Sequence, residues 1–489
     1  MRPYRALAHD PKSSYDVVVI GAGIGGLICA GLVAQSGKQV LLVEQHYMVG
    51  GYCSTFRRGA YIFDAATHFY PLLGNPATMT GSVLNSLGSR TRWVKMDPVD
   101  HFHFPDGSSF SVSADFNEYI DALKEAFPHE AKAIDRFFAI ARDAYVYGLL
   151  YYFRGRRHGR LDSMISLSLE SVLAREFKDP KLRLLLSADC AHWGSRPSTT
   201  SFVFDSMLRL SYFLGNYYPE GGSQVFADDL ARIVQDAGGD ILLRASAERI
   251  VVENGRAVAV EIATGLGAAR HTVRVAAGAV VSNADLTLTY EKLLGPDVVG
   301  PAAIANLRQL KPTMPCFLTH LGLKGVSVEE LEPHTGYHWR SWNADDVALD
   351  AFKIFVPTIY EPKMAPGGEQ ILILQRIMEF EYDNVRDWTA HKQRVEDDLL
   401  TRVEALIPGL STKIVSRQSA SAYTSYRFTL NTQGAMLGWE MAPGQLGESR
   451  PAMTGRVKNL HFCGHWTRPG GGITPVIVSA VDVARQITS

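Results

Sequence analysis

The stretch DVVVIGAGIGGLICAGLVAQSGKQVLLVE, from Asp16 to Glu44, decides the fold. It holds a β-branched run at 16–20, a glycine-rich turn, a helical pattern, a break at Gly37, and a second β-rich run at 39–43 that ends in an acid. Strand patterns on both sides of a helical pattern predict one βαβ unit of a parallel sheet.

The glycines of this unit have the spacing Gly21-x-Gly23-x-x-Gly26. Gly21 allows a tight turn, Gly23 lets a pyrophosphate approach the backbone, and Gly26 lets the helix pack close to the strand. The helix N-terminus then offers free N–H groups to the phosphates. Glu44 follows Gly26 by 18 residues, where a carboxylate accepts the hydroxyls of an unphosphorylated ribose. This spacing alone also fits an ordinary glycine-rich turn, but the strand, helix and acid around it favour a dinucleotide site.

The overall composition is that of an ordinary globular protein. A chain of 489 residues is too long for one core and predicts two domains. Lys and Arg number 49 against 50 for Asp and Glu, so the chain has no net positive charge that would attract nucleic acid.

The uncharged span 17–37 is long enough for a membrane helix, but its glycines favour the βαβ unit. We expect a cytoplasmic protein, because the arm before Asp16 is too short for a transit peptide and lacks an apolar signal core.

The cysteines form no metal-binding spacing, and we predict reduced thiols and no metal site. They are Cys29, Cys53, Cys190, Cys316 and Cys463.

The rest of the chain predicts an α/β protein with a Rossmann-like domain and an inserted mixed α+β domain. Helical and aromatic patterns prevail between 76 and 217, with one amphipathic helix expected over 117–141, and β-rich runs follow at 241–262. The predicted dinucleotide domain comprises 12–75, 218–285 and 455–489, and the predicted substrate domain comprises 76–217 and 286–454.

A double glycine, Gly50-Gly51, follows Glu44 by six residues and resembles the second fingerprint of flavoproteins with two dinucleotide-binding domains. In that family the pair passes close to the diphosphate of FAD. The amine-oxidase branch usually has arginine on both sides of the pair, whereas this chain has Met48 and Tyr52 there, which favours another branch. An ordinary loop is the alternative interpretation of the pair.

Near the C-terminus a strand ending at Gly464 precedes Gly470-Gly471-Gly472 and a helical run at 473–487. A helix that opens on glycine here can direct its positive end toward the flavin pyrimidine edge, where negative charge gathers on reduction.

Five motifs together resemble the phytoene desaturase, carotenoid isomerase and retinol saturase family of flavoproteins, in the family's order and over most of the chain. They are GAGIGGL near the start, GGSQVFADDLARIVQDAGGDI in the middle, VVSNAD, LNTQGAMLGWEMAPGQ, and CGHWTRPGGGITPVIVSA near the end. The resemblance implies non-covalent FAD, an apolar tunnel and chemistry on carbon–carbon bonds of long polyenes. The implied cofactor contacts are Gly21, Ala22, Gly23, Gly25, Gly26, Glu44, Gln45, Gly50, Gly51, Ser54, Thr55, Ala247, Gly464, His465, Gly472, Ile473, Thr474 and Val476.

One position departs from the pattern. Related flavoproteins often have Asp or Glu after the glycine that matches Gly464, and His465 stands there in this chain. A carboxylate's role is therefore not assigned to His465.

Flavin chemistry on an unactivated polyene depends on positioning and on exclusion of water more than on a catalytic dyad. Desaturation, saturation and redox-neutral isomerisation remain alternatives, and the electron acceptor stays open. Our candidates for catalysis are His68, which follows the strand at Asp64, and Arg468, which lies beside the glycines expected to face the flavin. A structural role is the alternative for each.

Two other functions remain open at this point. A flavin amine oxidase would share the fingerprint and use Tyr426 and Trp439 as walls of an aromatic cage. A prenyl-lipid carrier of the GDP-dissociation-inhibitor type would share the fold without flavin chemistry, although the intact glycines oppose it.

The segment 145–161 combines an aromatic and leucine-rich run with Arg154, Arg156, Arg157 and Arg160. Such side chains suit the headgroup boundary and anionic lipid, so we predict peripheral contact with a membrane surface. A core helix followed by a solvated basic loop is the alternative.

Overall fold

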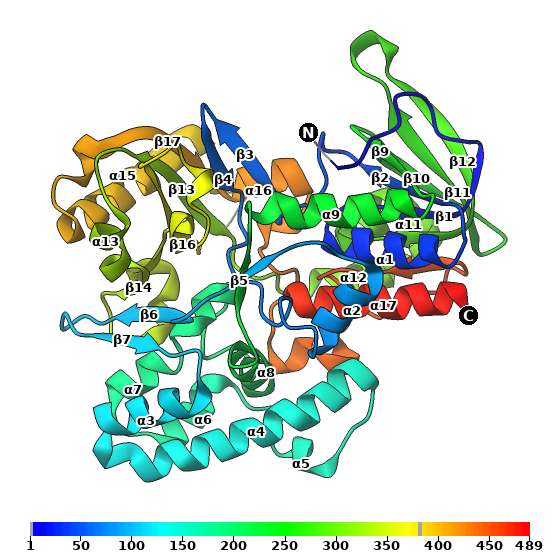
Figure 1. Ribbon diagram of the computed structural model, residues 1–489. Helices are drawn as coiled ribbons and strands as arrows, with labels where there is room; N and C mark the ends of the chain where they lie inside the picture. The colour runs from blue at the N-terminus through cyan, green and yellow to red at the C-terminus, as the bar shows by residue number, and fades with distance from the viewer. Residues whose placement is uncertain (1–2, 380–383) are drawn as a thin grey trace.

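The computed structural model of the chain describes residues 3–379 and 384–489, and two seven-stranded sheets organise it (Figure 1). The strands of the first sheet are, in spatial order, β10 (Ser246–Glu253), β11 (Arg256–Thr264), β12 (His271–Ser282), β1 (Ser14–Ile20), β2 (Val40–Glu44) and β9 (Asp240–Leu243), with β18 (Leu460–Phe462) also beside β12.

The predicted βαβ unit lies at the centre of this sheet. β1 pairs in parallel with β2, Val17 opposite Val40, and also in parallel with β12. The helix α1 (Ile24–Gln35) connects β1 to β2 and packs against α9 (Ser223–Asp236) and α17 (Ile473–Thr488). The prediction of a Rossmann-like α/β fold is therefore confirmed.

Successive side chains of β1 point to opposite faces of the sheet, as in any β-strand, and are buried in the core on one face or the other. Val17 and Val19 belong to the core beneath α1, α9 and α17. Val18 and Ile20 belong to the core on the opposite face, which the helical segment 289–294 and α12 (Pro301–Arg308) cover. Each fully buried Val or Ile contributes about 1.5–3 kcal/mol, so burial on both faces fixes the sheet between its two helical layers.

The second sheet is antiparallel except for one parallel pair, β14 with β6. Its strands are, in order, β17 (Ile414–Ala420), β13 (Cys316–Leu323), β16 (Gln370–Ile377), β15 (Ala351–Phe355), β14 (Gly336–Trp339), β6 (Asp100–His103) and β7 (Ser109–Val112). The helix α15 (Trp388–Leu406) supplies Val395, Leu399 and Val403 to the core on this sheet.

Helices from the region 116–212 form a separate layer below the second sheet in Figure 1. They are α3 (Phe116–Ala126), α4 (Ala131–Arg154), α5 (Gly159–Asp162), α6 (Leu169–Glu176), α7 (Pro180–Leu185) and α8 (Phe202–Tyr212).

Two expectations for the region 76–217 are wrong. The single helix expected over 117–141 is broken into α3 and α4, because Pro128 lacks an N–H donor and disfavours helical geometry at Phe127. The hairpin of β6 and β7 was also not expected within the helical region, and it adds two strands to the second sheet.

The remaining strands and α-helices of the described chain are short. The strands are β3 (Thr55–Arg58), β4 (Tyr61–Asp64), β5 (Trp93–Lys95) and β8 (Tyr217–Pro219), and the helices are α2 (Met79–Leu87), α10 (Leu286–Leu288), α11 (Pro296–Val299), α13 (Val328–Leu331), α14 (Val347–Asp350) and α16 (Ala422–Thr429). Across 3–379 and 384–489, none of the helices has the length and apolar character needed to cross a bilayer. All five cysteines are free thiols, as expected.

Candidate active site

The turn after β1 shows why glycine stands at its key positions. Gly21 has a φ of +93°, and a Cβ on Gly26 would collide with the Gly21 carbonyl oxygen. The N-cap of α1 is Gly23, and no side chain caps this helix end. The first N–H groups of α1 therefore stay available for an anion, as the phosphate interpretation requires.

Glu44 ends β2 beside this turn. Its Oε2 accepts the N–H of Ala22 at 2.8 Å, and its Oε1 accepts the N–H of His46 at 2.8 Å. Burial raises the pKa of Glu44, and the two N–H donors oppose that rise. The backbone thus holds the carboxylate in a fixed orientation on the cavity wall.

The second glycine pair lies directly against the first turn. Gly23 and Gly50 form a parallel β-bridge, and a Cβ on Gly51 would lie 3.4 Å from the Cα of Gly23. Gly50 has a φ of +117°, and a Cβ there would collide with the Cys53 carbonyl oxygen. Two glycine segments that are 27 residues apart (23 to 50) therefore form one narrow cradle.

A second helix N-terminus faces the same space. α17 begins after Gly472, which has a φ of +94° and no side-chain cap. A Cβ on Gly471 would collide with the Leu437 carbonyl oxygen, so only glycine lets these two loops approach so closely. At the end of β18, the N–H of Gly464 donates to Ser479 Oγ at 3.0 Å, which ties this strand to α17.

His465 takes no charged role in this arrangement. Burial, followed by repulsion from Arg450, lowers its pKa to about 3, so the ring is neutral near pH 7. Its Nε2 lies 3.3 Å from Asn431 Oδ1, a polar contact that fixes the ring.

One continuous cavity of about 1570 Å³ collects these groups. All of the predicted cofactor residues line it except Ala22 and Gly26, whose roles are to orient Glu44 and to pack the helix. Two uncapped helix ends, a fixed carboxylate and glycine cradles that a Cβ would obstruct all fit an FAD molecule. The individual contacts remain predictions.

The remainder of the cavity has apolar walls, mainly from α4 and α8. The lining side chains from these helices include Tyr145, Val146, Leu149, Leu150, Phe153, Phe204, Met207 and Leu208. Val146, Leu150 and Leu214 line the cavity although they are 49%, 37% and 47% exposed, so the cavity opens to the surface here.

The two catalytic candidates occupy different surroundings. His68 lies on the cavity wall, and its ring stacks on Phe355 with centroids 4.6 Å apart. The guanidinium of Arg468 instead donates to the carbonyl oxygens of Arg450 and Glu448, at 2.9 Å and 2.6 Å. Arg468 thus holds two loop segments together in this structure, and it is not one of the residues that line the cavity.

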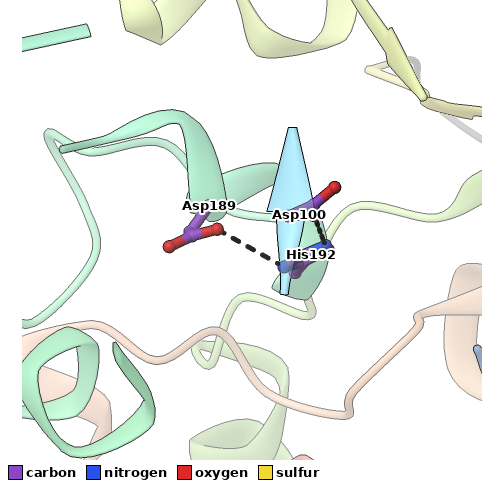
Figure 2. Close-up of side chains that lie close together, drawn as sticks. All are labelled: Asp100, Asp189 and His192. Atoms are coloured by element: carbon purple, nitrogen blue, oxygen red, sulfur yellow. Dashed lines mark ion pairs between the residues drawn. The ribbon is translucent and has the colours of Figure 1, made fainter. Parts of the chain in front are cut away.

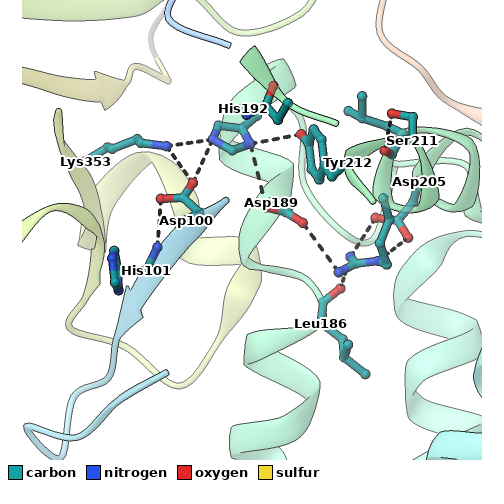
Figure 3. A network of polar contacts seen from close by, with 12 residues as sticks. Asp100, His101, Leu186, Asp189, His192, Asp205, Ser211, Tyr212 and Lys353 are labelled. Atoms are coloured by element: carbon teal, nitrogen blue, oxygen red, sulfur yellow. Dashed lines mark hydrogen bonds and ion pairs between the residues drawn. The ribbon is translucent and has the colours of Figure 1, made fainter. Parts of the chain in front are cut away.

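A buried charged network, which the sequence patterns did not indicate, reaches the cavity wall. His192 lines the cavity and lies 3.2 Å from Asp100 Oδ2 and 3.6 Å from Asp189 Oδ1 (Figure 2). The ammonium of Lys353 lies 2.6 Å from Asp100 Oδ2 and 2.9 Å from His192 Nε2 (Figure 3). Although the two carboxylates and the imidazole are close enough to bind a cation, Lys353 already supplies a positive charge to them.

Asp189 extends this network toward α8. Arg209 pairs with Asp189 at 3.4 Å and with Asp205 at 2.9 Å, while the Tyr212 hydroxyl lies 3.3 Å from His192 Nδ1. Tyr212 and His192 together make a polar patch in an otherwise apolar part of the wall.

Comparison with known proteins agrees with the resemblance seen in the sequence. The chain is 27% identical over 511 residues to a chloroplastic prolycopene isomerase of Daucus carota, covering 97% of this chain and 80% of the relative. It is also 27% identical over 511 residues to an all-trans-retinol 13,14-reductase of Danio rerio, covering 94% and 83%.

Among solved structures, cyclohexylamine oxidase from Brevibacterium oxydans superposes with a TM-score of 0.65 at 18% identity, covering 97% of this chain and 99% of that one. This likeness confirms the fold class. The sequence profile of the flavin-containing amine oxidoreductase family matches residues 24–488 of this chain. The predicted flavin cofactor, FAD, is thereby confirmed at the level of the family. The chain therefore belongs to the flavin-containing amine oxidoreductase family.

Proposed function

We propose that the protein is an FAD-dependent enzyme that acts on carbon–carbon bonds of a long apolar polyene of the carotenoid or retinoid type. The observation that carries this proposal is the continuous cavity, which joins a dinucleotide cradle to apolar walls from α4 and α8. Its volume of about 1570 Å³ exceeds the roughly 300–1,000 Å³ of an ordinary small-molecule site, which leaves room for a dinucleotide and a second long molecule.

The family comparison supports the same substrate class. The two curated relatives described above are named for prolycopene and for all-trans-retinol, and each match covers most of this chain. One name denotes an isomerase and the other a reductase, so the proposal includes both redox and redox-neutral chemistry on the polyene. When bound, flavin supplies hydride or electron exchange at its N5 atom.

The protein's own residues would hold the polyene and exclude water. Phe153, Phe204 and Met207 supply apolar and polarisable contacts along the wall, and such contacts align a chain without polar anchors. A water-poor cavity also strengthens the electrostatic effect of the few polar groups that face it.

His68 is our proposed proton-transfer group. Burial, then repulsion from His320, Lys353 and His192, lowers the pKa of His68 well below its usual value, so its ring is neutral near pH 7. Within the described residues its buried Nε2 has no hydrogen-bond partner, so this nitrogen is available to exchange a proton with a bound substrate, and the lowered pKa means that it would release an accepted proton readily.

The aromatic cage of the amine-oxidase alternative is not supported by the residues proposed for it. Trp439 is buried against Trp466, with ring centroids 4.7 Å apart, and its Nε1 donates to the Trp466 carbonyl oxygen. Neither Trp439 nor Tyr426 belongs to the described lining of the cavity. The family membership likewise disfavours a carrier without flavin.

A panel of polyenes tests the proposed function. Purified holoenzyme, incubated with prolycopene, phytoene and all-trans-retinol in detergent, aerobically and with reduced flavin, is expected to shift the polyene absorption or change its cis/trans pattern. Product analysis by chromatography separates reduction, desaturation and isomerisation. Peroxide release with simple amines, together with unaltered polyenes under both conditions, would contradict the proposal.

We further propose that the cavity mouth rests on an anionic bilayer, from which an insoluble polyene enters. The exposed cavity-lining residues Val146, Leu150 and Leu214 lie at this opening, and Arg154 at the end of α4 also lines it. Two ion pairs reduce the net positive charge of the basic segment 154–160: Arg157 pairs with Asp162 at 2.7 Å, and Arg160 pairs with Asp143 at 3.2 Å.

This pairing divides the arginines into a test set and a control set. Arg154 and Arg156 are exposed and form no ion pair with any residue that the structure describes, so Arg154→Gln/Arg156→Gln removes two free charges. At about 1 kcal/mol for each arginine near an anionic surface, liposome affinity should fall by roughly thirtyfold. Arg157→Gln/Arg160→Gln should have a much smaller effect. Sedimentation with phosphatidylserine liposomes at low salt measures both, and wild-type protein that never sediments would refute the proposal.

A further inference from the structure

Arg450 is a buried cation at the cofactor end of the cavity. Its side chain is 1% exposed, and its guanidinium donates only to uncharged acceptors. The carbonyl oxygens that accept are those of Thr467 at 3.2 Å, Gln445 at 3.3 Å, Trp439 at 3.1 Å and His465 at 2.8 Å. Across 3–379 and 384–489, Arg450 forms no ion pair with a carboxylate.

Arg209, a second deeply buried arginine, shows the contrast. Arg209 is 4% exposed and pairs with Asp205 and Asp189, and these carboxylates raise its pKa although burial alone would lower it. Burial lowers the pKa of Arg450 to about 9, because no carboxylate offsets the loss of water. Arg450 nevertheless remains protonated near pH 7, so it is a lone charge in a dry environment. A lone buried charge is unfavourable by several kcal/mol, which carbonyl dipoles offset only in part.

The position of Arg450 points to the group that balances this charge. A Cβ built on Gly470 would lie 3.7 Å from the Cζ of Arg450, and Gly470 lines the cavity. The guanidinium therefore lies directly behind the wall formed by Gly470, Gly471 and Gly472, at the uncapped N-terminus of α17. The pyrimidine edge of the flavin is predicted to face this same wall.

We propose that Arg450 is the buried counter-charge for the reduced flavin. When the ring gains two electrons and one proton, it retains one negative charge, which is centred on the pyrimidine. A guanidinium behind Gly470 stabilises that charge and therefore raises the two-electron reduction potential of bound FAD. The N-terminus of α17 acts in the same direction. This inference rests on flavin binding alone and goes beyond the proposed polyene chemistry.

Two substitutions separate the charge from the hydrogen bonds. Arg450→Met keeps the length and apolar stem of the side chain and removes the charge, whereas Arg450→Lys keeps the charge and loses most of the donors. The first readout is sulfite binding to the holoenzyme: sulfite forms a bond to flavin N5, and its electron pair places negative charge on the pyrimidine. The second readout is the midpoint potential by equilibration with reference dyes, which needs no substrate.

We expect Arg450→Met to retain FAD but bind sulfite at least tenfold more weakly, while Arg450→Lys stays within about threefold of wild type. A tenfold change corresponds to about 30 mV for a two-electron couple, so the dyes should report a fall of that size. An Arg450→Met holoenzyme with the wild-type potential would overturn the proposal. If that variant fails to fold, the midpoint potential of FAD in the wild-type holoenzyme provides the test. A wild-type potential no higher than that of free FAD would also overturn the proposal. Neither result depends on whether a polyene is the substrate.

Discussion

Replacing Gly23 with valine is expected to give folded protein that contains no FAD. Gly23 lines the cavity at the uncapped N-terminus of α1, and a Cβ there would lie 3.1 Å from Asn283 Nδ2. That single carbon is tight but can be accommodated by a small movement of the amide. The two methyl groups of valine would extend further, into the space that the pyrophosphate needs beside the backbone. Because this space belongs to the cofactor and not to the core, flavin is lost while the fold survives.

Neighbouring glycines of the same helix provide the controls. A Cβ on Gly26 would collide with the Gly21 carbonyl oxygen, so Gly26→Val should fail to fold. A Cβ on Gly31 would make an ordinary contact of 3.4 Å with Ile233, so Gly31→Ala should keep both fold and flavin. The ratio of visible to ultraviolet absorbance measures flavin content, and circular dichroism measures folding. Full flavin occupancy in folded Gly23→Val would contradict the assignment of the phosphate site.

The βαβ unit that contains Gly23 and Gly26 was predicted from the sequence and is present in the structure, whereas its contacts with the cofactor stay predictions. The βαβ unit depends on neighbours in the sequence: strand periodicity, helical periodicity and glycines that have steric roles. Gly50 and Gly51 were predicted to contribute to the same site, and the structure shows Gly51 next to Gly23 across the cradle. The geometry of the βαβ unit is therefore largely determined by residues that are close in the sequence.

Longer-range features had no comparable signal. The β6–β7 hairpin becomes part of the second sheet only because β14, more than 200 residues later, pairs with β6. Pro128, by contrast, was a readable signal of a helix break that the periodicity concealed. The sequence alone does not show whether an arginine is buried or exposed. Only the folded structure shows that Arg450 is buried and that carbonyl oxygens, not carboxylates, accept its hydrogen bonds.

The charged network at the cavity wall is the clearest case of information that only the fold supplies. Lys353 contacts Asp100, 253 residues away, and His192, 161 residues away. Each residue alone has the sequence surroundings of an ordinary polar side chain. The parallel pairing of β6 with β14 and the antiparallel pairing of β15 with β14 bring Asp100 and Lys353 together, and the segment Ala188–Trp193 supplies His192.

Lys353→Met is expected to destabilise the protein by about 3–5 kcal/mol, the usual effect of removing one partner from a buried ion pair. Asp100 and Lys353 are 7% and 1% exposed, so water does not replace the missing ammonium at Asp100. Urea unfolding, followed by circular dichroism, measures the change. The double variant Asp100→Leu/Lys353→Met removes both charges and should recover much of the loss, and a double variant no more stable than Lys353→Met would contradict the ion-pair explanation.

The same pair predicts how this destabilisation depends on pH. Burial raises the pKa of Asp100, but the Lys353 ammonium and His192 outweigh it and lower the pKa to about 2. The pKa in the unfolded chain is about 3.9, so the ionised carboxylate contributes stability above pH 4 and loses that contribution as the pH falls toward 2. Without Lys353, only His192 of these two groups still opposes burial, so the pKa of Asp100 rises and its ionised form stabilises the folded state less above pH 4. The difference in unfolding free energy between wild type and Lys353→Met should therefore be greatest near neutral pH and shrink steadily between pH 4 and pH 2. A difference that stays constant over this range would mean that the lost contacts of the Lys353 ammonium with the rings of Phe69 and Tyr337, 3.8 Å and 4.7 Å away, and not its lost pairing with Asp100, cause the destabilisation.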